Sequence, residues 1–322
     1  MYDVVALGEL LIDFTPEGKS ENGNMLFERN PGGAPANVLA CLAKLGKRTS
    51  FIGKVGEDEF GRFLRQVLID KGIAVDGLAM DREVNTTLAF VHLQADGERS
   101  FSFYRNPGAD TRLKPEEIKK EMFNTRIFHF GSLSLTDEPA RSATITALKL
   151  AKDRKLLVSY DPNLRPHLWP NLDEAKTQIL AVMDQADIVK ISGEELEFLT
   201  GSQDIEQGST RLCQEYGLRM LLVTLGKEGC YYRLGDLSGH VPGFRVNTID
   251  ATGAGDAFLG GMLFQVLQRA KEIDQWTAEE MAMSVRFANA IGALVTTRKG
   301  AIPAMPNLHE IEQLLASKSL TR

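Results

Sequence analysis

Short apolar runs rich in β-branched residues alternate along the chain with longer amphipathic stretches. The apolar runs predict core strands at residues 4–8, 50–55, 127–130, 156–161, 188–191 and 220–224. Between them, apolar residues recur at steps of three and four, which predicts helices at residues 59–71, 138–152 and 173–185. Strands that alternate with helices are typical of a parallel sheet covered by helices on both faces. We therefore expect a doubly wound α/β fold with a mostly parallel sheet.

One stretch of the chain breaks this alternation. Residues 86–94 and 99–105 read as two strands, and the glycine-containing segment 95–98 suits a hairpin turn between them. Residues 14–29 lack helical periodicity and can add strands to the same element. Such a ribbon has few neighbours to cover its faces, so we expect segments 14–29 and 86–105 to form a small antiparallel β lid that pairs in a homodimer. With no repeat and no long linker, residues 1–322 are expected to form a single domain.

Composition and charge exclude several classes of protein. The chain has 37 Lys and Arg against 43 Asp and Glu, a net charge of −6, and no basic block that could follow a nucleic-acid backbone. Its three cysteines, Cys41, Cys213 and Cys230, lie too far apart for a zinc motif or a disulfide framework. No apolar run approaches the roughly 18 residues that a membrane span needs, and no signal or transit segment precedes the first strand. We expect a cytoplasmic protein, complete from its first residue, that binds neither nucleic acid nor membrane.

The clearest candidate for chemistry is the segment 250–256, Asp-Ala-Thr-Gly-Ala-Gly-Asp, which leads into an apolar helix. Small residues at the start of a buried helix leave backbone N–H groups exposed at its positive end, which suits an anion. Asp256 falls in the first turn, where the helix dipole favours a carboxylate that can accept a proton from an alcohol. The combination suits phosphoryl transfer to a hydroxyl group, although a glycine-rich helix start can also serve packing alone. The chain contains neither a Walker P-loop nor a complete G-x-G-x-x-G.

A second candidate lies near the N-terminus, where residues 30–38 read Asn-Pro-Gly-Gly-Ala-Pro-Ala-Asn-Val. Gly32 and Gly33 let the backbone approach a polyol, and Asn37, one helical turn later, offers both a donor and an acceptor. Asp13 follows the first predicted strand, at the sheet edge where open α/β folds gather their ligands. Read alone, Asp13 is equally well explained as the residue that starts a turn.

With these motifs the chain resembles the ribokinase-like (PfkB) sugar kinases over nearly its whole length. The resemblance implies an ATP-dependent kinase with an anion hole and a catalytic base, here Gly253, Ala254, Gly255 and Asp256. It also implies that the sugar is bound by Asp13, Gly32, Gly33, Asn37 and Asp256 itself. In such a kinase the base takes the proton of the attacking hydroxyl while the amides stabilise charge on the transferred phosphoryl group.

For the nucleotide, the resemblance points to the loop after residues 220–224 and to the late helix 278–295. It assigns ATP contacts to Thr224, Gly226, Gly229, Gly253, Gly255 and Asn289. Many family members have N-x-x-E where this chain has Ser192-Gly193-Glu194-Glu195, so a nucleotide contact by Ser192 departs from the pattern, whereas Glu195 can organise Mg²⁺ through water. The resemblance further implies a monovalent cation such as K⁺ beside the anion hole, at Asp250, Thr252, Val295 and Gly300.

Within the family, residues 103–110, 129–133 and 161–165 look like fructokinase segments, and they add Phe103, Arg105 and Arg165 to the expected sugar site. The last segment is shared with 2-keto-3-deoxygluconate kinases, whose acidic substrate needs a cation. Asp110 follows Arg105 closely and can neutralise it, which favours a neutral ketohexose. The expected reaction is therefore phosphorylation of fructose to fructose 6-phosphate. The alternatives are a 2-keto-3-deoxygluconate kinase, a ribofuranoside (nucleoside-like) kinase and a sugar sensor without turnover.

Overall fold

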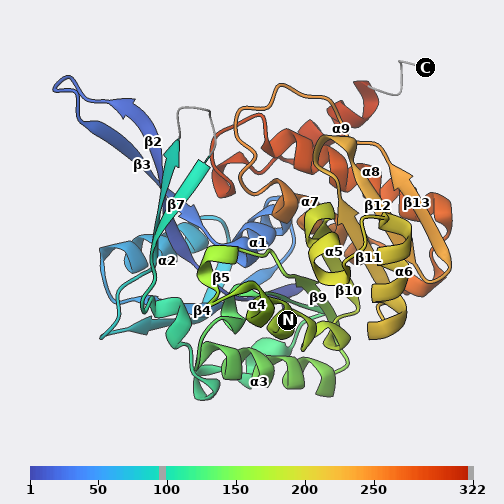
Figure 1. Ribbon diagram of the computed structural model, residues 1–322, viewed down its shortest axis with the longest axis horizontal. Helices are drawn as coiled ribbons and strands as arrows, with labels where there is room; N and C mark the ends of the chain where they lie inside the picture. The colour runs from blue at the N-terminus through green and yellow to red at the C-terminus, as the bar shows by residue number, and fades with distance from the viewer. Residues whose placement is uncertain (94–98, 318–322) are drawn as a thin grey trace.

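The structure is a computed structural model that describes residues 1–93 and 99–317, and its largest element is a nine-stranded sheet (Figure 1). The strand order is β13-β12-β11-β10-β9-β8-β1-β4-β5. The strands are β1 Val4–Leu7, β4 Thr49–Gly56, β5 Ile73–Asp81, β8 Ile127–Gly131, β9 Leu157–Asp161, β10 Ile188–Ser192, β11 Met220–Thr224, β12 Cys230–Leu234 and β13 Leu237–Val241. In this sheet the neighbouring strands β11, β10, β9, β8, β1, β4 and β5 run parallel to one another. Strands β12 and β13 add an antiparallel edge. The predicted, mostly parallel sheet is confirmed.

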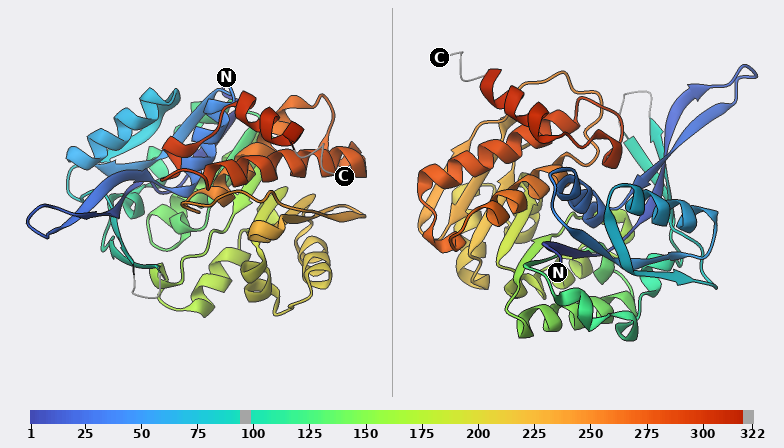
Figure 2. Two further views of the ribbon diagram at one scale, coloured as in Figure 1. Left: turned by 90° about the horizontal axis from the view of Figure 1, so that it is seen from above. Right: turned by 180° about the vertical axis from the view of Figure 1, so that it is seen from behind.

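Helices cover both faces of this sheet (Figure 2). One face packs against α1 Ala34–Lys44, α7 Ala254–Gln268 and α8 Ala278–Val295, with α2 Glu59–Asp70 and α9 Leu308–Ser317 at its margins. The other packs against α3 Ala140–Asp153, α4 Leu172–Leu180, α5 Gly193–Thr200 and α6 Ile205–Tyr216. Successive strand residues point to opposite faces, so Val4 and Ala6 lie in one core while Val5 and Leu7 lie in the other. In the part of the chain that the structure describes, no helix is both long and apolar enough to cross a membrane.

The elements that the sequence pattern did not predict lie mainly at the sheet edges. The edge strands β5 and β13 are only partly buried, so their apolar pattern is diluted by polar residues. Two predicted helices also differ in length. The helix predicted at 138–152 begins at Ala140, and Pro139 is its N-cap residue. The helix predicted at 173–185 ends at Leu180, and Met183–Gln185 forms a separate 3₁₀ turn.

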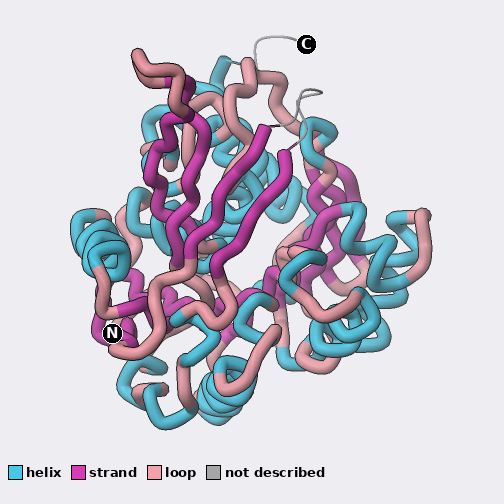
Figure 3. The backbone as a smooth tube through the Cα atoms, turned by 60° about the vertical axis from the view of Figure 1, so that its left-hand side comes forward, coloured by secondary structure: helices cyan, strands magenta, loops and turns pink. Residues whose placement is uncertain are grey.

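A second, four-stranded sheet forms the predicted lid (Figure 3). Its order is β3-β2-β6-β7, with β2 Leu11–Lys19, β3 Met25–Gly32, β6 Leu88–Leu93 and β7 Arg99–Tyr104. Two antiparallel hairpins meet through a parallel pairing of β2 with β6, and the predicted turn at 95–98 lies outside the described residues. Phe90 stacks on Phe14 at 4.8 Å and meets Phe27 and Tyr104 edge-on. Met25, Leu26, Phe27 and Tyr104 are exposed on this sheet, which projects from the body of the protein (Figures 1 and 3).

Candidate active site

The first turn of α7 forms the mouth of the predicted anion hole. Gly253 caps the helix with a φ of 75°, a left-handed conformation that favours glycine, and a Cβ there would lie 2.5 Å from that of Ala301. The N–H of Ala254 donates to the carbonyl of Ala251 at 3.2 Å. Among the described residues, the N–H groups of Gly253 and Gly255 have no hydrogen-bond acceptor. The opening therefore presents two unoccupied donors, at Gly253 and Gly255, where the helix dipole is positive.

Asp256 lies inside this first turn and is held by the second motif. The side-chain amide of Asn37 donates to Asp256 Oδ2 at 2.8 Å, across 219 positions in the sequence. Both side chains are buried, and Asn37 Oδ1 has no partner among the described residues. Burial raises the pKa of Asp256, while the charge of Lys190 and the Asn37 hydrogen bond act in the opposite direction. The structure thus joins the two predicted motifs and gives the predicted base a fixed orientation.

The two glycines at the start of α1 bring the backbone close to Asp13. A Cβ on Gly32 would lie 2.1 Å from Asp13 Oδ2. Gly33 has a φ of 123°, and a Cβ there would lie 2.3 Å from the carbonyl oxygen of Glu9. Burial raises the pKa of Asp13 to about 7, which Arg165 opposes and Asp250 reinforces. Asp13 is consequently a poorly solvated carboxyl group that gains from any hydroxyl donor placed beside it.

Arg105 is already occupied by protein groups. Its Nε pairs with Asp110 at 2.7 Å, its Nη1 donates to Thr136 Oγ1 at 2.9 Å and its Nη2 to the carbonyl of Leu133 at 2.8 Å. Only 4% of its side chain is exposed. The neutralisation by Asp110 that the sequence suggested is therefore present. A direct contact between Arg105 and a sugar stays a prediction.

The other two predicted sugar residues lie on facing segments. Arg165 is exposed in the loop after β9, where its Nη1 donates to the carbonyl of Leu164 at 3.1 Å. In the lid, the ring of Phe103 on β7 lies 5.0 Å from the ring of His167 in that same loop. The lid therefore contacts the segment that carries Arg165, and the sugar contacts of Phe103 and Arg165 stay predictions.

A pocket of about 850 Å³ extends from the end of β11 across the mouth of α7 to α8. The predicted nucleotide residues that line it are Thr224, Gly226, Gly229, Gly255 and Asn289. Asn289 uses its side-chain amide to donate to the carbonyls of Val241 at 3.0 Å and Pro242 at 3.2 Å, so it shapes the pocket wall as well as facing its interior. The pocket is large enough for a nucleotide and reaches the anion hole at Gly255.

Ser192 and Glu195 cap the start of α5 reciprocally. Ser192 Oγ accepts from the N–H of Glu195 at 3.1 Å, and Glu195 Oε2 accepts from the N–H of Ser192 at 2.7 Å. Glu195 Oε1 also accepts from the N–H of Leu164 at 2.7 Å. Neither residue lines the nucleotide pocket. Serine thus performs the capping that asparagine also provides, and the predicted ATP and Mg²⁺ contacts of this pair stay predictions.

Three of the four residues predicted to hold a monovalent cation lie together. Asp250 Oδ1 accepts from the N–H and the hydroxyl of Thr252 at 3.0 and 2.6 Å, and Asp250 Oδ2 accepts from the N–H of Gly300 at 3.0 Å. Val295 ends α8, and its carbonyl accepts from the N–H of Arg298 at 3.3 Å. Among the described residues, no cluster of three or more His, Cys, Asp or Glu could hold a metal by itself. A cation here therefore depends on backbone carbonyls or on the nucleotide phosphates.

The structure also reveals polar groups that the sequence analysis missed. Lys190 Nζ lies 2.6 Å from Asp161 Oδ2, and both side chains are buried beneath the mouth of α7. Glu9 is buried as well; its Oε1 accepts from the N–H of Ala34 at 2.8 Å, and burial raises its pKa to about 7. The available signal was a charged residue inside an otherwise apolar strand, as at Lys190 in β10.

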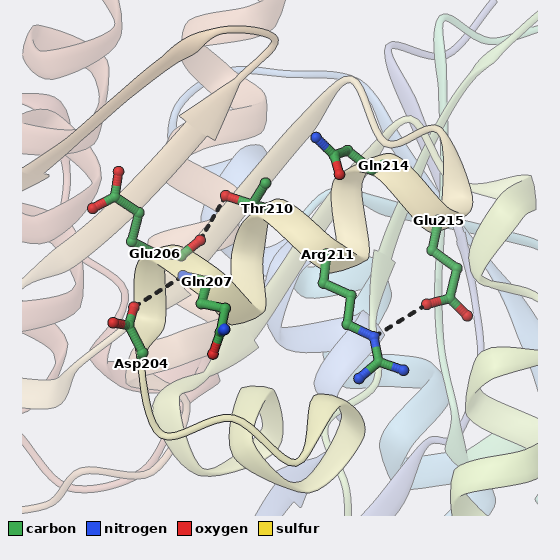
Figure 4. A pocket seen from close by; sticks show the side chains of 7 residues that line it. All are labelled: Asp204, Glu206, Gln207, Thr210, Arg211, Gln214 and Glu215. Carbon is green, nitrogen blue, oxygen red and sulfur yellow. Dashed lines mark hydrogen bonds and ion pairs between the residues drawn. The ribbon is translucent and has the colours of Figure 1, made fainter.

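A separate hollow lies on the exposed flank of α6 (Figure 4). It is lined by Asp204, Glu206, Gln207, Thr210, Arg211, Gln214 and Glu215. The side chains partner one another: Arg211 pairs with Glu215 at 3.5 Å, and Asp204 caps the helix at the N–H of Gln207. None of the predicted site residues lies here, so this hollow is not part of the candidate site.

Comparison with known proteins shows what the chain as a whole is similar to. A family model described as pfkB family carbohydrate kinase matches residues 1–308. Fructokinase-1 of Zea mays is 47% identical over 315 residues, which cover 97% of this chain and 97% of that protein.

Solved structures with the same fold include ligand complexes. Fructokinase from Xylella fastidiosa with bound ATP has a TM-score of 0.91 and 36% identity, covering 99% of this chain and 100% of that one. Fructokinase from Vibrio cholerae O395 with fructose, ADP and calcium has a TM-score of 0.88 and 36% identity, covering 98% and 99%. A double mutant of the latter, with fructose, ADP and potassium bound, has a TM-score of 0.87.

Proposed function

The chain belongs to the pfkB family of carbohydrate kinases, and we propose that it transfers the γ-phosphoryl group of ATP to the primary hydroxyl of fructose. The product is fructose 6-phosphate. The observation that carries the proposal is the 2.8 Å contact between Asn37 and Asp256 at the mouth of α7. It joins a polyol-binding motif to a base beside an anion hole, which is the arrangement that phosphoryl transfer to an alcohol requires.

Each group has a role in the reaction. Asp13 and Asn37 bind sugar hydroxyls, with Gly32 and Gly33 allowing the backbone to approach the sugar. Asp256 accepts the proton of the primary hydroxyl as its oxygen forms a bond to the γ-phosphorus. The bond from that phosphorus to the β–γ bridging oxygen breaks, and ADP leaves. The N–H groups at Gly253 and Gly255 stabilise the charge on the phosphoryl oxygens.

The proposal includes the nucleotide and two ions. ATP occupies the pocket at Thr224, Gly226 and Asn289. Mg²⁺ would neutralise charge on the phosphates of ATP, and Glu195, whose two carboxylate oxygens accept from the N–H groups of Leu164 and Ser192, would hold that ion through water. A monovalent cation, K⁺ in the proposal, fits the loop at Asp250 beside the anion hole, as the potassium of the Vibrio cholerae mutant structure suggests.

We expect fructose to be favoured over a sugar acid because the positive charge of Arg105 is already neutralised by Asp110. Its ion pair with Asp110 is buried, so Arg105 offers an incoming carboxylate a neutralised cation, and the cation that acts on Asp13 is the exposed Arg165. Burial of an unpaired carboxylate costs several kcal/mol. We expect kcat/KM for fructose to exceed that for 2-keto-3-deoxygluconate by at least roughly tenfold, about 1.4 kcal/mol.

This preference is measured by following ADP release from the purified protein with fructose, 2-keto-3-deoxygluconate and a ribofuranoside nucleoside. The variant Asp110→Asn removes the nearest counter-charge of Arg105, leaving Asp137 at 3.7 Å, and should narrow the ratio of kcat/KM between fructose and the acid. A wild-type preference for the acid, or for the nucleoside, would contradict the fructokinase assignment. Absence of ADP release with every acceptor would favour the sugar sensor.

We further propose that residues 1–322 act as one domain whose lid pairs two copies. The exposed Met25, Leu26, Phe27 and Tyr104 lie on the projecting sheet, where a second lid would cover them. We expect a dimer by light scattering at micromolar concentration, and Phe27→Asp combined with Tyr104→Asp should convert it to a monomer. A wild-type monomer under these conditions would rule out the lid dimer.

The expected compartment is the cytoplasm. This part of the proposal rests on Cys41, Cys213 and Cys230, which all lie in the described residues and are free thiols. Burial raises the pKa of the Cys213 thiol to about 11 and that of Cys41 to about 12, so both are unreactive.

A further inference from the structure

One strand of the central sheet carries a buried cation toward the active site. The neighbours of Lys190 in β10, Val189 and Ile191, point into the core beneath α3 to α6. Lys190 therefore faces the opposite side, toward α1 and α7, and 7% of its side chain is exposed. Its Nζ lies 2.6 Å from Asp161 Oδ2 on β9, the adjacent strand, where the register pairs Tyr160 with Val189.

The position of this cation is directly below the anion hole. A Cβ added to Gly255 would lie 3.0 Å from Lys190 Nζ, so the ammonium group touches the first turn of α7. A helix N-terminus is positive, and a buried cation beside it is electrostatically unfavourable. Packing alone would be served by an apolar residue, as at Ile188, Val189 and Ile191 of this strand. The placement puts a charged donor against the first turn of α7, which packing alone does not require.

The neighbouring acceptors are consistent with a site that is completed by ligands. Asp161 Oδ1 and Asn37 Oδ1 are buried, and neither has a hydrogen-bond partner among the described residues. Burial opposes the charged form of Lys190, yet Asp161, Glu195 and Asp256 together raise its pKa above the ordinary value. Lys190 is thus an ammonium group throughout the neutral range, with N–H groups in excess of its one Asp161 bond.

We propose that Lys190 is a catalytic residue that donates to an oxygen of the transferred γ-phosphoryl group, and that Asp161 is the positioning residue that aims it. The inference rests on the proposed kinase function. Together with the N–H groups of Gly253 and Gly255, Lys190 surrounds the phosphoryl group from the sheet side. The sugar oxygen still forms the new bond to phosphorus, ADP still leaves with the bridging oxygen, and Asp256 still takes the proton. Lys190 keeps all of its protons.

The main test is Lys190→Met, which retains the length and apolar stem of the side chain and removes its charge. We expect kcat with fructose to fall about 10²- to 10³-fold, as for loss of an oxyanion donor, with the KM for fructose changed by less than about threefold. The matched control is Lys54→Met. Lys54 is equally buried in the same sheet, where it pairs with Asp81 at 3.1 Å and Glu117 at 2.9 Å and donates to the carbonyl of Arg112 at 3.3 Å, and none of these partners is a predicted site residue. It should lose stability but keep kcat.

Two readouts separate a phosphoryl contact from a structural role. First, the wild type should bind a nonhydrolysable ATP analogue more tightly than ADP by calorimetry, and Lys190→Met should lose that difference. Second, the acid limb of the kcat profile, which reports Asp256, should move to higher pH in Lys190→Met. The charged groups that face Asp256 are Lys190 and Arg165, which lower its pKa, and Glu195 and Asp161, which oppose them.

Should Lys190→Met fail to fold, the double variant Lys190→Met/Asp161→Asn leaves no unpaired buried charge and is measured in its place. A folded variant with kcat within threefold of the wild type would overturn the inference. So would an unchanged preference for the ATP analogue over ADP. The nucleotide comparison needs no sugar, so it tests Lys190 even if fructose proves not to be the acceptor.

Discussion

Replacement of Asp13 by asparagine should make the protein more stable and less active, and the size of both effects follows from the structure. Burial raises the pKa of Asp13 from its ordinary 3.8 to about 7. The folded protein therefore disfavours the ionised carboxyl relative to the unfolded chain by about 4 kcal/mol at pH above 7. Because the side chain is only partly buried, water weakens this effect, and we expect a gain of about 2 kcal/mol from Asp13→Asn. For 322 residues this corresponds to about 3 °C in Tm.

The difference in stability between wild type and Asp13→Asn depends on pH in a defined direction. Below about pH 4 the carboxyl is protonated in both the folded and the unfolded protein, so wild type and variant should have the same Tm. Between about pH 4 and 7 the unfolded chain ionises while the folded protein resists, and the wild type loses stability relative to the variant. Above about pH 7 both states are ionised and the difference stays constant. Differential scanning calorimetry from pH 4 to 8 measures this curve.

The same substitution removes a charged acceptor from the sugar site. A hydrogen bond to a charged group contributes about 1.5–3 kcal/mol, so kcat/KM for fructose should fall about 10- to 150-fold. In the wild type, the KM for fructose should rise as pH falls below about 7, since protonated Asp13 accepts fewer hydrogen bonds. A Tm difference between Asp13→Asn and the wild type that stays the same across this pH range would refute the assignment of Asp13 as a partly buried sugar ligand. So would a wild-type kcat/KM in the variant.

Further outcomes follow from the other groups of the site. Asp256→Asn should lower kcat by about 10²- to 10⁴-fold while fructose and ATP still bind by calorimetry, and near-normal turnover would remove Asp256 from the mechanism. Its Tm at neutral pH should exceed that of the wild type, because burial raises the pKa of Asp256. Replacement of K⁺ by tetramethylammonium at saturating Mg²⁺ should lower kcat, and Asp250→Asn should abolish that salt dependence; equal rates in both salts would contradict the cation site.

The parallel core was predictable because its strands are buried on both faces and stand out as apolar runs. The strands from β8 to β11 lie within one or two residues of their predicted bounds. Strands β5 and β13 were not predicted, because each has a solvent-facing side that adds polar residues to the apolar pattern. The lid strands at 86–94 and 99–105 were predicted from strand-like runs joined by a turn, and those in 14–29 from the loss of helical periodicity, but their arrangement was not predicted. The parallel pairing of β2 with β6 joins two hairpins that are distant in sequence, which only the tertiary fold determines.

The site was predictable where function demands unusual local sequence. Two glycines before α1 and two before Asp256 stand out in the sequence. The structure gives the reason for them, because a Cβ at each position would collide with neighbouring backbone or side chains. Lys190 was not found, because a single lysine in a strand reads as a surface residue until its burial is known. For Arg105, the sequence did not show how many protein groups its side chain contacts. The motif suggested a ligand contact, whereas the fold supplies three protein acceptors for its guanidinium group.

The distribution of charge across the mouth of α7 gives the reaction its direction. On the sugar side, Asn37 Oδ1 is a buried acceptor without a donor among the described residues and Asp13 is a partly buried carboxyl group, and we propose that sugar hydroxyls donate to both. On the nucleotide side, Gly253 and Gly255 present N–H groups, and Lys190 adds a positive charge below them. Asp256 lies at the boundary between the acceptors and the donors, held by Asn37. In the proposed reaction the proton of the sugar hydroxyl passes to the Asp256 carboxylate while the phosphoryl oxygens face the donors, so binding of sugar and nucleotide would align the attacking oxygen with phosphorus before any bond changes.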